Sequence, residues 1–156
     1  MMKMQALPSE KGTYNLSHYE NVNQSFNWKD VERTFSWSKS GKVNMAYEAI
    51  DRHAENGKAD QIALYYSDAK RDESYTFKQL KQYSNKAANV LKDVGVKKGD
   101  RVFIFMPRSP ELYFAFLGTL KIGAIVGPLF EAFMEGAVRD RLEDSEAKVL
   151  VTTRHY

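Results

Sequence analysis

The stretch that decides the fold spans residues 94–133 and reads VGVKKGDRVFIFMPRSPELYFAFLGTLKIGAIVGPLFEAF. Within it, RVFIF (101–105) predicts a buried strand. Ser-Pro-Glu (109–111) predicts a helix start, because Ser caps, Pro suits the first turn and a carboxylate faces the positive end of the helix dipole. The run LYFAFLGTLKI (112–122) predicts a helix buried on most sides, and the apolar residues 124–130 predict a second strand.

The residues after this stretch continue the same alternation. A helix is expected over 135–143 and a strand over 149–153. Strand, helix, strand, helix, strand with short links predicts an α/β fold with a parallel βαβαβ sheet and right-handed crossovers. Ligands of such sheets bind where the strands end, which here means residues 106–109 and 130–134.

The residues before it predict further elements of an α/β domain. A helix is expected over 43–56, and strands over 61–67 and 75–77 with a charged turn between them. Thr76 and Gln79 fit a capping box that opens another helix, which ends at Gly95. Tyr65, Tyr66, Phe103 and Phe105 are expected in the core.

The first 42 residues differ from the rest in being polar with spaced aromatic side chains. This pattern predicts an extended arm that lies against a larger body, with a short helical face made by Trp28, Val31 and Phe35. We therefore divide the chain into an arm, residues 1–42, and a first α/β subdomain, residues 43–156. Because the chain stops just past a strand, we expect the subdomain to be a truncated part of a larger enzyme.

Composition limits the class of protein. Its 156 residues, 43% hydrophobic and 28% charged, suit a soluble globular domain. The net charge is +3, and basic and acidic residues are interleaved along the chain. No basic block is present that would predict binding to nucleic acid or an anionic membrane. No apolar run reaches the roughly 18 residues of a membrane span, and there is no cysteine. We expect a cytoplasmic protein.

No constellation of residues in this chain predicts catalysis or metal binding. A GxGxxG motif is missing, and the three histidines lack ligand-like spacing. Ser109 has no neighbouring base, and Asp51-Arg52-His53 fits the surface of a helix end. On the residues alone, the prediction stops at a soluble α/β domain with a ligand-facing edge. Part of an enzyme, a stand-alone binding module, and a structural or interaction domain all stay open.

Three stretches together resemble the adenylate-forming acyl-CoA synthetases. They are YTFKQL (75–80), the run 94–133, and SGKVNMAYEAIDRHAE (40–55), of which the last is similar to the signature of the acetate–CoA ligase branch. The resemblance extends from about Tyr14 to Thr153. It implies the amino-terminal subdomain of an AMP-forming enzyme. The alternative that the resemblance leaves open is a stand-alone module that binds CoA or an adenine nucleotide without turnover.

The resemblance also implies a reaction, its cofactors and a site. Acetate and ATP would form acetyl-adenylate with Mg²⁺, and CoA would then release AMP. The family's phosphate loop, ribose-binding Asp and adenylating Lys lie beyond this chain, so we expect the chain alone to be inactive. The segment that corresponds to the CoA entrance is Phe130, Glu131 and Ala132. Acetyl-CoA synthetases often show Phe-Gly-Gly there, so the acyl group, acetate or another short or medium chain, stays open.

The missing remainder has one more consequence. A subdomain separated from its neighbours should expose apolar surface, so we expect the chain to self-associate.

Overall fold

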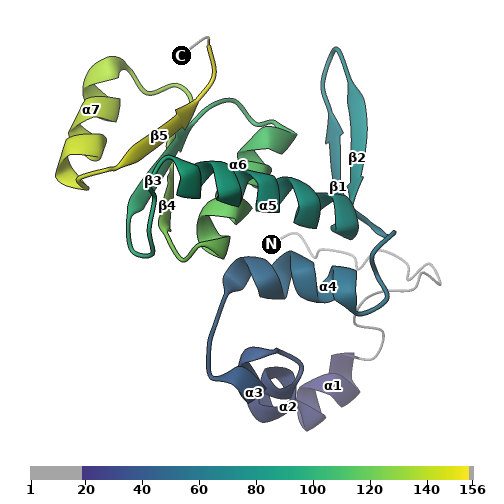
Figure 1. Ribbon diagram of the computed structural model, residues 1–156. Helices are drawn as coiled ribbons and strands as arrows, with labels where there is room; N and C mark the ends of the chain where they lie inside the picture. Colours follow the sequence, from purple (N-terminus) through teal and green to yellow (C-terminus); the bar gives the residue numbers. More distant parts are fainter. Residues whose placement is uncertain (1–18, 155–156) are drawn as a thin grey trace, which may run out of the picture.

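The computed structural model describes residues 19–154 and is built around a three-stranded parallel sheet. The strand order is β4 (Ile125–Pro128), β3 (Arg101–Phe105), β5 (Val149–Thr152), with β3 in the centre (Figure 1). Val102 lies opposite Val126 on one side and Val149 on the other. The predicted parallel α/β sheet is confirmed, with the central strand at the predicted residues.

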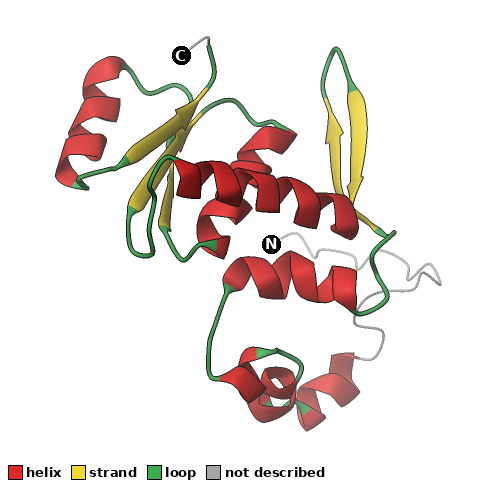
Figure 2. Cartoon of the chain, viewed as in Figure 1, coloured by secondary structure: helices red, strands yellow, loops and turns green. Residues whose placement is uncertain are grey.

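Two helices cover one face of this sheet. They are α5 (Phe77–Asp93) and α6 (Pro110–Lys121), which pack against each other beside the strands (Figure 2). Alternate residues of β3 point toward them, so Val102 and Ile104 are 0% and 1% exposed. The apolar side chains packed around these two residues form the core, and they include Leu91, Val96, Ala115, Phe116 and Val151.

Gly118 allows α5 and α6 to approach closely. A Cβ atom at this position would lie 2.8 Å from the Ala87 Cβ and 2.9 Å from the Ala88 backbone nitrogen. Both distances are shorter than a carbon contact tolerates. The helix–helix interface therefore requires glycine here.

Among residues 19–154, the opposite face of the sheet is covered by α7 alone (Glu135–Asp144), which lies beside β5 (Figure 1). This helix contains no buried residue. Leu150 and Thr152 of β5 point to this side and are exposed. One face of the sheet is thus a packed core and the other is largely open.

The two helices of the packed face begin in different ways. Thr76 Oγ1 accepts a hydrogen bond from the Gln79 backbone nitrogen, and Gln79 Oε1 accepts one from the Thr76 nitrogen, so the predicted capping box is confirmed. Ser109 is the N-cap of α6 as predicted, but its side chain makes no capping hydrogen bond.

A β-hairpin precedes α5 and projects away from the helices (Figure 1). Its strands are β1 (Ile62–Ser67) and β2 (Asp72–Thr76), which pair antiparallel. Residues 72–74, predicted as turn, belong to β2. Tyr65 is 76% exposed, so its predicted place in the core is wrong. Its neighbours in β1, Leu64 and Tyr66, are half-buried, and successive side chains of a strand point to opposite sides, so Tyr65 lies on the exposed side.

The helix expected over 43–56 is present and contains a π turn. It comprises η1 (Tyr47–Asp51) and α4 (Arg52–Glu55). The Asn44 side chain accepts a hydrogen bond from the Tyr47 nitrogen and donates to the backbone oxygen of Lys121 at 3.1 Å. This element is therefore bonded to the end of α6.

The described part of the arm is folded into three short helices. They are α1 (Tyr19–Ser25), α2 (Trp28–Arg33) and α3 (Trp37–Ser40). This corrects the expectation of an extended arm. Local capping explains the difference, because Asn27 Oδ1 accepts from the Lys29 nitrogen at 2.9 Å and Gly41, with φ of 65°, ends α3. Of the helical face predicted from Trp28, Val31 and Phe35, α2 contains the first two residues, whereas Phe35 lies in the turn after it.

The arm is joined to η1 and α4 by polar contacts. Buried Glu48 accepts hydrogen bonds from the backbone nitrogen and the hydroxyl of Ser36. Arg52 pairs with Glu48 at 3.1 Å, donates to the Thr34 oxygen and lies 4.8 Å above the ring of Phe35. The rest of the predicted arm, residues 1–18 with Tyr14, lies outside the described residues, as do residues 155 and 156.

Within residues 19–154, no helix has both the length and the apolar character needed to cross a membrane.

Candidate ligand-binding edge of the sheet

The predicted site segment lies directly after β4. The Leu129 nitrogen donates to the Ile104 oxygen at 2.8 Å, which extends the parallel pairing one residue past the strand. The chain then turns, and the Phe133 nitrogen donates to the Phe130 oxygen at 3.0 Å. Phe130 is 60% exposed, and Glu131 and Ala132 are exposed as well. The three predicted residues thus sit together on the surface at the carboxyl end of the strand.

An aromatic pair and an arginine form the inner side of this turn. The rings of Phe130 and Phe133 meet edge to face, with 5.8 Å between centroids and an interplanar angle of 88°. The guanidinium carbon of Arg141 lies 4.2 Å above the Phe133 ring. Arg141 is on α7, so a residue from the open face of the sheet contacts the site segment.

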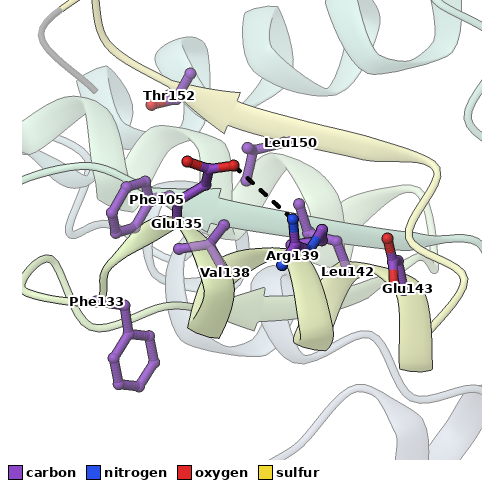
Figure 3. A pocket seen from close by; sticks show the side chains of 9 residues that line it. All are labelled: Phe105, Phe133, Glu135, Val138, Arg139, Leu142, Glu143, Leu150 and Thr152. Carbon is purple, nitrogen blue, oxygen red and sulfur yellow. Dashed lines mark ion pairs between the residues drawn. The ribbon is translucent and has the colours of Figure 1, made fainter.

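A cavity of about 600 Å³ adjoins Phe133 (Figure 3). It lies between α7 and the strands β3 and β5, and Figure 3 shows Phe133 at one end of it. Glu135 and Arg139 form an ion pair of 3.9 Å among its lining residues. The other lining side chains are mostly apolar: Phe105, Val138, Leu142 and Leu150, with Thr152 and Glu143. A cavity of this size and character can accept an apolar group of a ligand.

The end of β3, the second predicted ligand edge, is occupied by the protein's own side chains. Met106 and Ser109 are buried. Burial acts to raise the pKa of Glu111, but hydrogen bonds from Ser109, from the backbone and from Arg71 hold that pKa below its ordinary value. Arg71 Nη1 lies 3.5 Å from Glu111 Oε1, which joins the hairpin to α6. The open edge is therefore the one after β4.

The remaining titratable groups weighed in the sequence have structural contacts. Asp51 Oδ1 accepts from Lys121 Nζ at 2.7 Å. The His53 ring lies 5.1 Å from the Phe77 ring, and its pKa is lowered by burial and by the charges of Arg52 and Lys58. In the part of the chain that the structure describes, no three His, Cys, Asp or Glu residues gather where they could hold a metal ion.

Sequence reasoning missed the cavity and the role of α7 in building it. Val138 and Leu142, four residues apart, mark one apolar helix face, and this spacing was the available signal. The contact of Arg141 with Phe133 had no such signal, because it depends on how the turn before α7 is folded.

Comparison with known proteins identifies the family of the chain. The profile of the family described as AMP-binding enzyme matches residues 50–156. The chain is 65% identical to the acetyl-coenzyme A synthetase of Bacillus subtilis over 153 residues, which is 97% of the chain and 27% of that protein. It is 44% identical to the acetyl-coenzyme A synthetase of Methanothrix thermoacetophila over 122 residues, 75% of the chain and 18% of that protein.

Among solved structures, the chain resembles an acyl-CoA synthetase of Brucella canis with a TM-score of 0.77 and 31% identity. The match covers 88% of the chain and 25% of that structure. The matched part of the chain corresponds to 18% to 27% of the length of these three proteins. The family profile covers more than half of the chain, and the chain belongs to the family of AMP-binding enzymes.

Proposed function

We propose that this chain is the amino-terminal part of an AMP-forming acetate–CoA ligase. The observation that carries the proposal is the 65% identity to an acetyl-coenzyme A synthetase over nearly the whole chain. The exposed segment after β4 supports it, because ligands of parallel sheets bind at this edge.

The proposed reaction has two steps. A carboxylate oxygen of acetate attacks the α-phosphorus of ATP, and pyrophosphate leaves with the electron pair of the broken P–O bond. The sulfur of deprotonated CoA then attacks the carbonyl carbon of acetyl-adenylate, and AMP leaves. The first step joins two anions, so it requires cationic stabilisation. Mg²⁺ would supply it in the whole enzyme, but the residues described in this chain do not fit a metal site, so we assign them no metal-dependent role.

The proposed role of the chain itself is to support and line the passage for CoA. Helix α6 packs against β4, and the segment after β4 presents Phe130, Glu131 and Ala132 to the solvent. Phe130 offers an exposed ring to the pantetheine arm. Glu131 and Ala132 carry side chains where the family often has glycines, which narrows the passage and leaves open an acyl group other than acetate.

Acetate-dependent exchange of pyrophosphate into ATP tests this proposal. The chain should be assayed alone and in an extended version that includes its natural continuation. We expect exchange only in the extended version, because the residues that handle ATP are expected there. Exchange by the chain alone, or exchange in the extended version that does not depend on a carboxylic acid, would contradict the proposal.

A stand-alone module that binds CoA is the second candidate, and the open cavity beside Phe133 favours it. Calorimetry of this chain with CoA separates the two. Millimolar or tighter binding together with no exchange activity in the extended version supports the module, whereas exchange activity supports the ligase.

Self-association and a cytoplasmic location are further parts of the proposal. Ile125 and Met134 are exposed on or beside the sheet at 55% and 80%, and such apolar surface favours association. Sedimentation over a hundredfold range of concentration tests this, because a mass that does not change would contradict it. A cytoplasmic location is compatible with the cysteine-free sequence.

A further inference from the structure

We propose that Arg141 is a positioning residue for the candidate CoA segment, acting on Phe130 through the ring of Phe133. The inference rests on the proposed function, since it gives a role to a residue that contacts the segment from outside. It assigns the α7 helix a part in shaping the site at the end of β4.

The first step of the argument is how Arg141 itself is held. Its Nη1 atom donates to the backbone oxygen of Ala137 at 2.7 Å, one turn earlier on α7. Among residues 19–154 it forms no ion pair. The guanidinium is therefore bonded to its own helix, and its carbon lies 4.2 Å from the centre of the Phe133 ring. Such a cation–π contact suits the planar guanidinium better than the ammonium of lysine.

The second step is how Phe133 transmits this position. Its side chain is half-buried, contacts the guanidinium of Arg141 and is one of those that line the cavity. Its backbone nitrogen donates to the Phe130 oxygen, so ring and backbone of one residue both contact the site segment. The ring of Phe133 also contacts the exposed ring of Phe130 edge to face.

The third step is why Phe130 needs such support. An exposed phenylalanine side chain is free to exchange rotamers unless a neighbour selects one. A site that holds its contact residues in one geometry before the ligand arrives loses less entropy on binding. The sequence of contacts from Arg141 to Phe133 to Phe130 supplies this selection without any direct contact between Arg141 and the ligand.

The test places a fluorine label on Phe130 in this chain and follows its NMR signal in three variants. Arg141→Met keeps the length of the side chain and removes its charge and planar group, and Arg141→Lys keeps the charge alone. The matched control is Arg139→Met, which removes an arginine of the same helix that pairs with Glu135. Circular dichroism confirms in each case that the chain is folded.

We expect Arg141→Met to move the Phe130 signal toward that of a free phenylalanine side chain. Arg141→Lys should move the Phe130 signal most of the way toward that of a free side chain. Arg139→Met should leave the signal unchanged. An unchanged signal in Arg141→Met would overturn the proposal. So would a full retention of the signal in Arg141→Lys, since charge without planarity would then be sufficient.

A second readout separates this inference from the proposed function. In the extended version, Arg141→Met should raise the KM for CoA about tenfold and leave ATP–pyrophosphate exchange unchanged, because adenylation does not use the CoA segment. If Arg141→Met weakened ATP–pyrophosphate exchange by the same factor as it raised the KM for CoA, the positioning role would be overturned. If the NMR shift occurs but the extended version lacks ligase activity, Arg141 positions Phe130 and the proposed function is what fails.

Discussion

The two faces of the sheet differ in almost every physical respect. On the side of α5 and α6, Val102 and Ile104 are excluded from water and the helices meet without space for a methyl group at Gly118. On the side of α7, the helix has no buried residue, Leu150 is 37% exposed and a cavity of about 600 Å³ is open. The difference teaches that one face carries the stability of this chain, while the other is available for ligands and neighbours.

The strongest test of this contrast compares two apolar truncations on opposite faces. Ile104→Ala removes a fully buried side chain from the core, so we expect a loss of about 4 kcal/mol in the free energy of unfolding. Leu150→Ala removes a half-exposed side chain from the open face, with an expected loss of about 1 kcal/mol. Urea denaturation measures both, and equal losses would refute the contrast.

A glycine pair tests the same contrast by adding volume. Gly118→Ala forces a Cβ to within 2.9 Å of backbone atoms of α5, so we expect a loss of about 3 kcal/mol. Gly136→Ala on α7 meets no atom within 4 Å, and its stability should change by less than about 0.5 kcal/mol. The thermal midpoints of the two variants measure the difference. A tolerated Gly118→Ala would show that the packed face is less tight than described.

The ion pairs of the two faces should differ in the same direction. Lys121 and Asp51, on the packed side, form a pair whose side chains are only 10% and 13% exposed. Asp51→Asn leaves the lysine charge without its carboxylate, at a cost of about 2 kcal/mol. Its Nζ keeps a hydrogen bond to Asn85, which limits the loss.

The matched variant for the open face is Arg139→Met. It breaks a long, exposed pair with Glu135, and its effect should be close to zero in urea denaturation. A larger loss in Arg139→Met than in Asp51→Asn would reverse the expected order.

The smallest expected effect is a pH dependence that comes from His53. Its pKa lies below the ordinary 6.5 because burial disfavours the charged ring and Arg52 and Lys58 repel it. As the pH falls below 6.5, the unfolded chain takes up a proton before the folded chain does, so His53 contributes a loss of stability. The free energy of unfolding of the wild type minus that of His53→Gln should therefore decline slightly from pH 7.5 to 5.5. A difference that grows instead would contradict the direction of the shift.

The packed face is also the part that the sequence predicts well. RVFIF and the Thr76–Gln79 capping box have local signals, and the structure reproduces both. Predictions fail where a residue's environment depends on distant parts. Tyr65 is an aromatic residue in an apolar run, which is typical of a core, but it lies exposed on a projecting hairpin. Ser109 precedes Pro and Glu as a capping serine does, but its side chain makes no capping hydrogen bond.

The sequence predicts where the candidate site lies but not how it is built. Strand order and the resemblance to a family point to the end of β4, and the exposed residues Phe130, Glu131 and Ala132 do lie there, while their contact with a ligand stays a prediction. The support behind them has no sequence signal, because the contact of Arg141 with Phe133 joins a turn and a helix through a cation and a ring rather than through a periodic pattern.

The π turn at residues 47–51 makes spacing itself a requirement of this fold. A π turn contains one residue more than an α turn, and here it lets Glu48 face Ser36 while Asp51 faces Lys121. Deletion of a single residue between these two carboxylates would restore α-helical winding and turn one of them away from its partner. A chain with one residue fewer in this turn would therefore lose either the contact of Glu48 with the arm or the contact of Asp51 with α6.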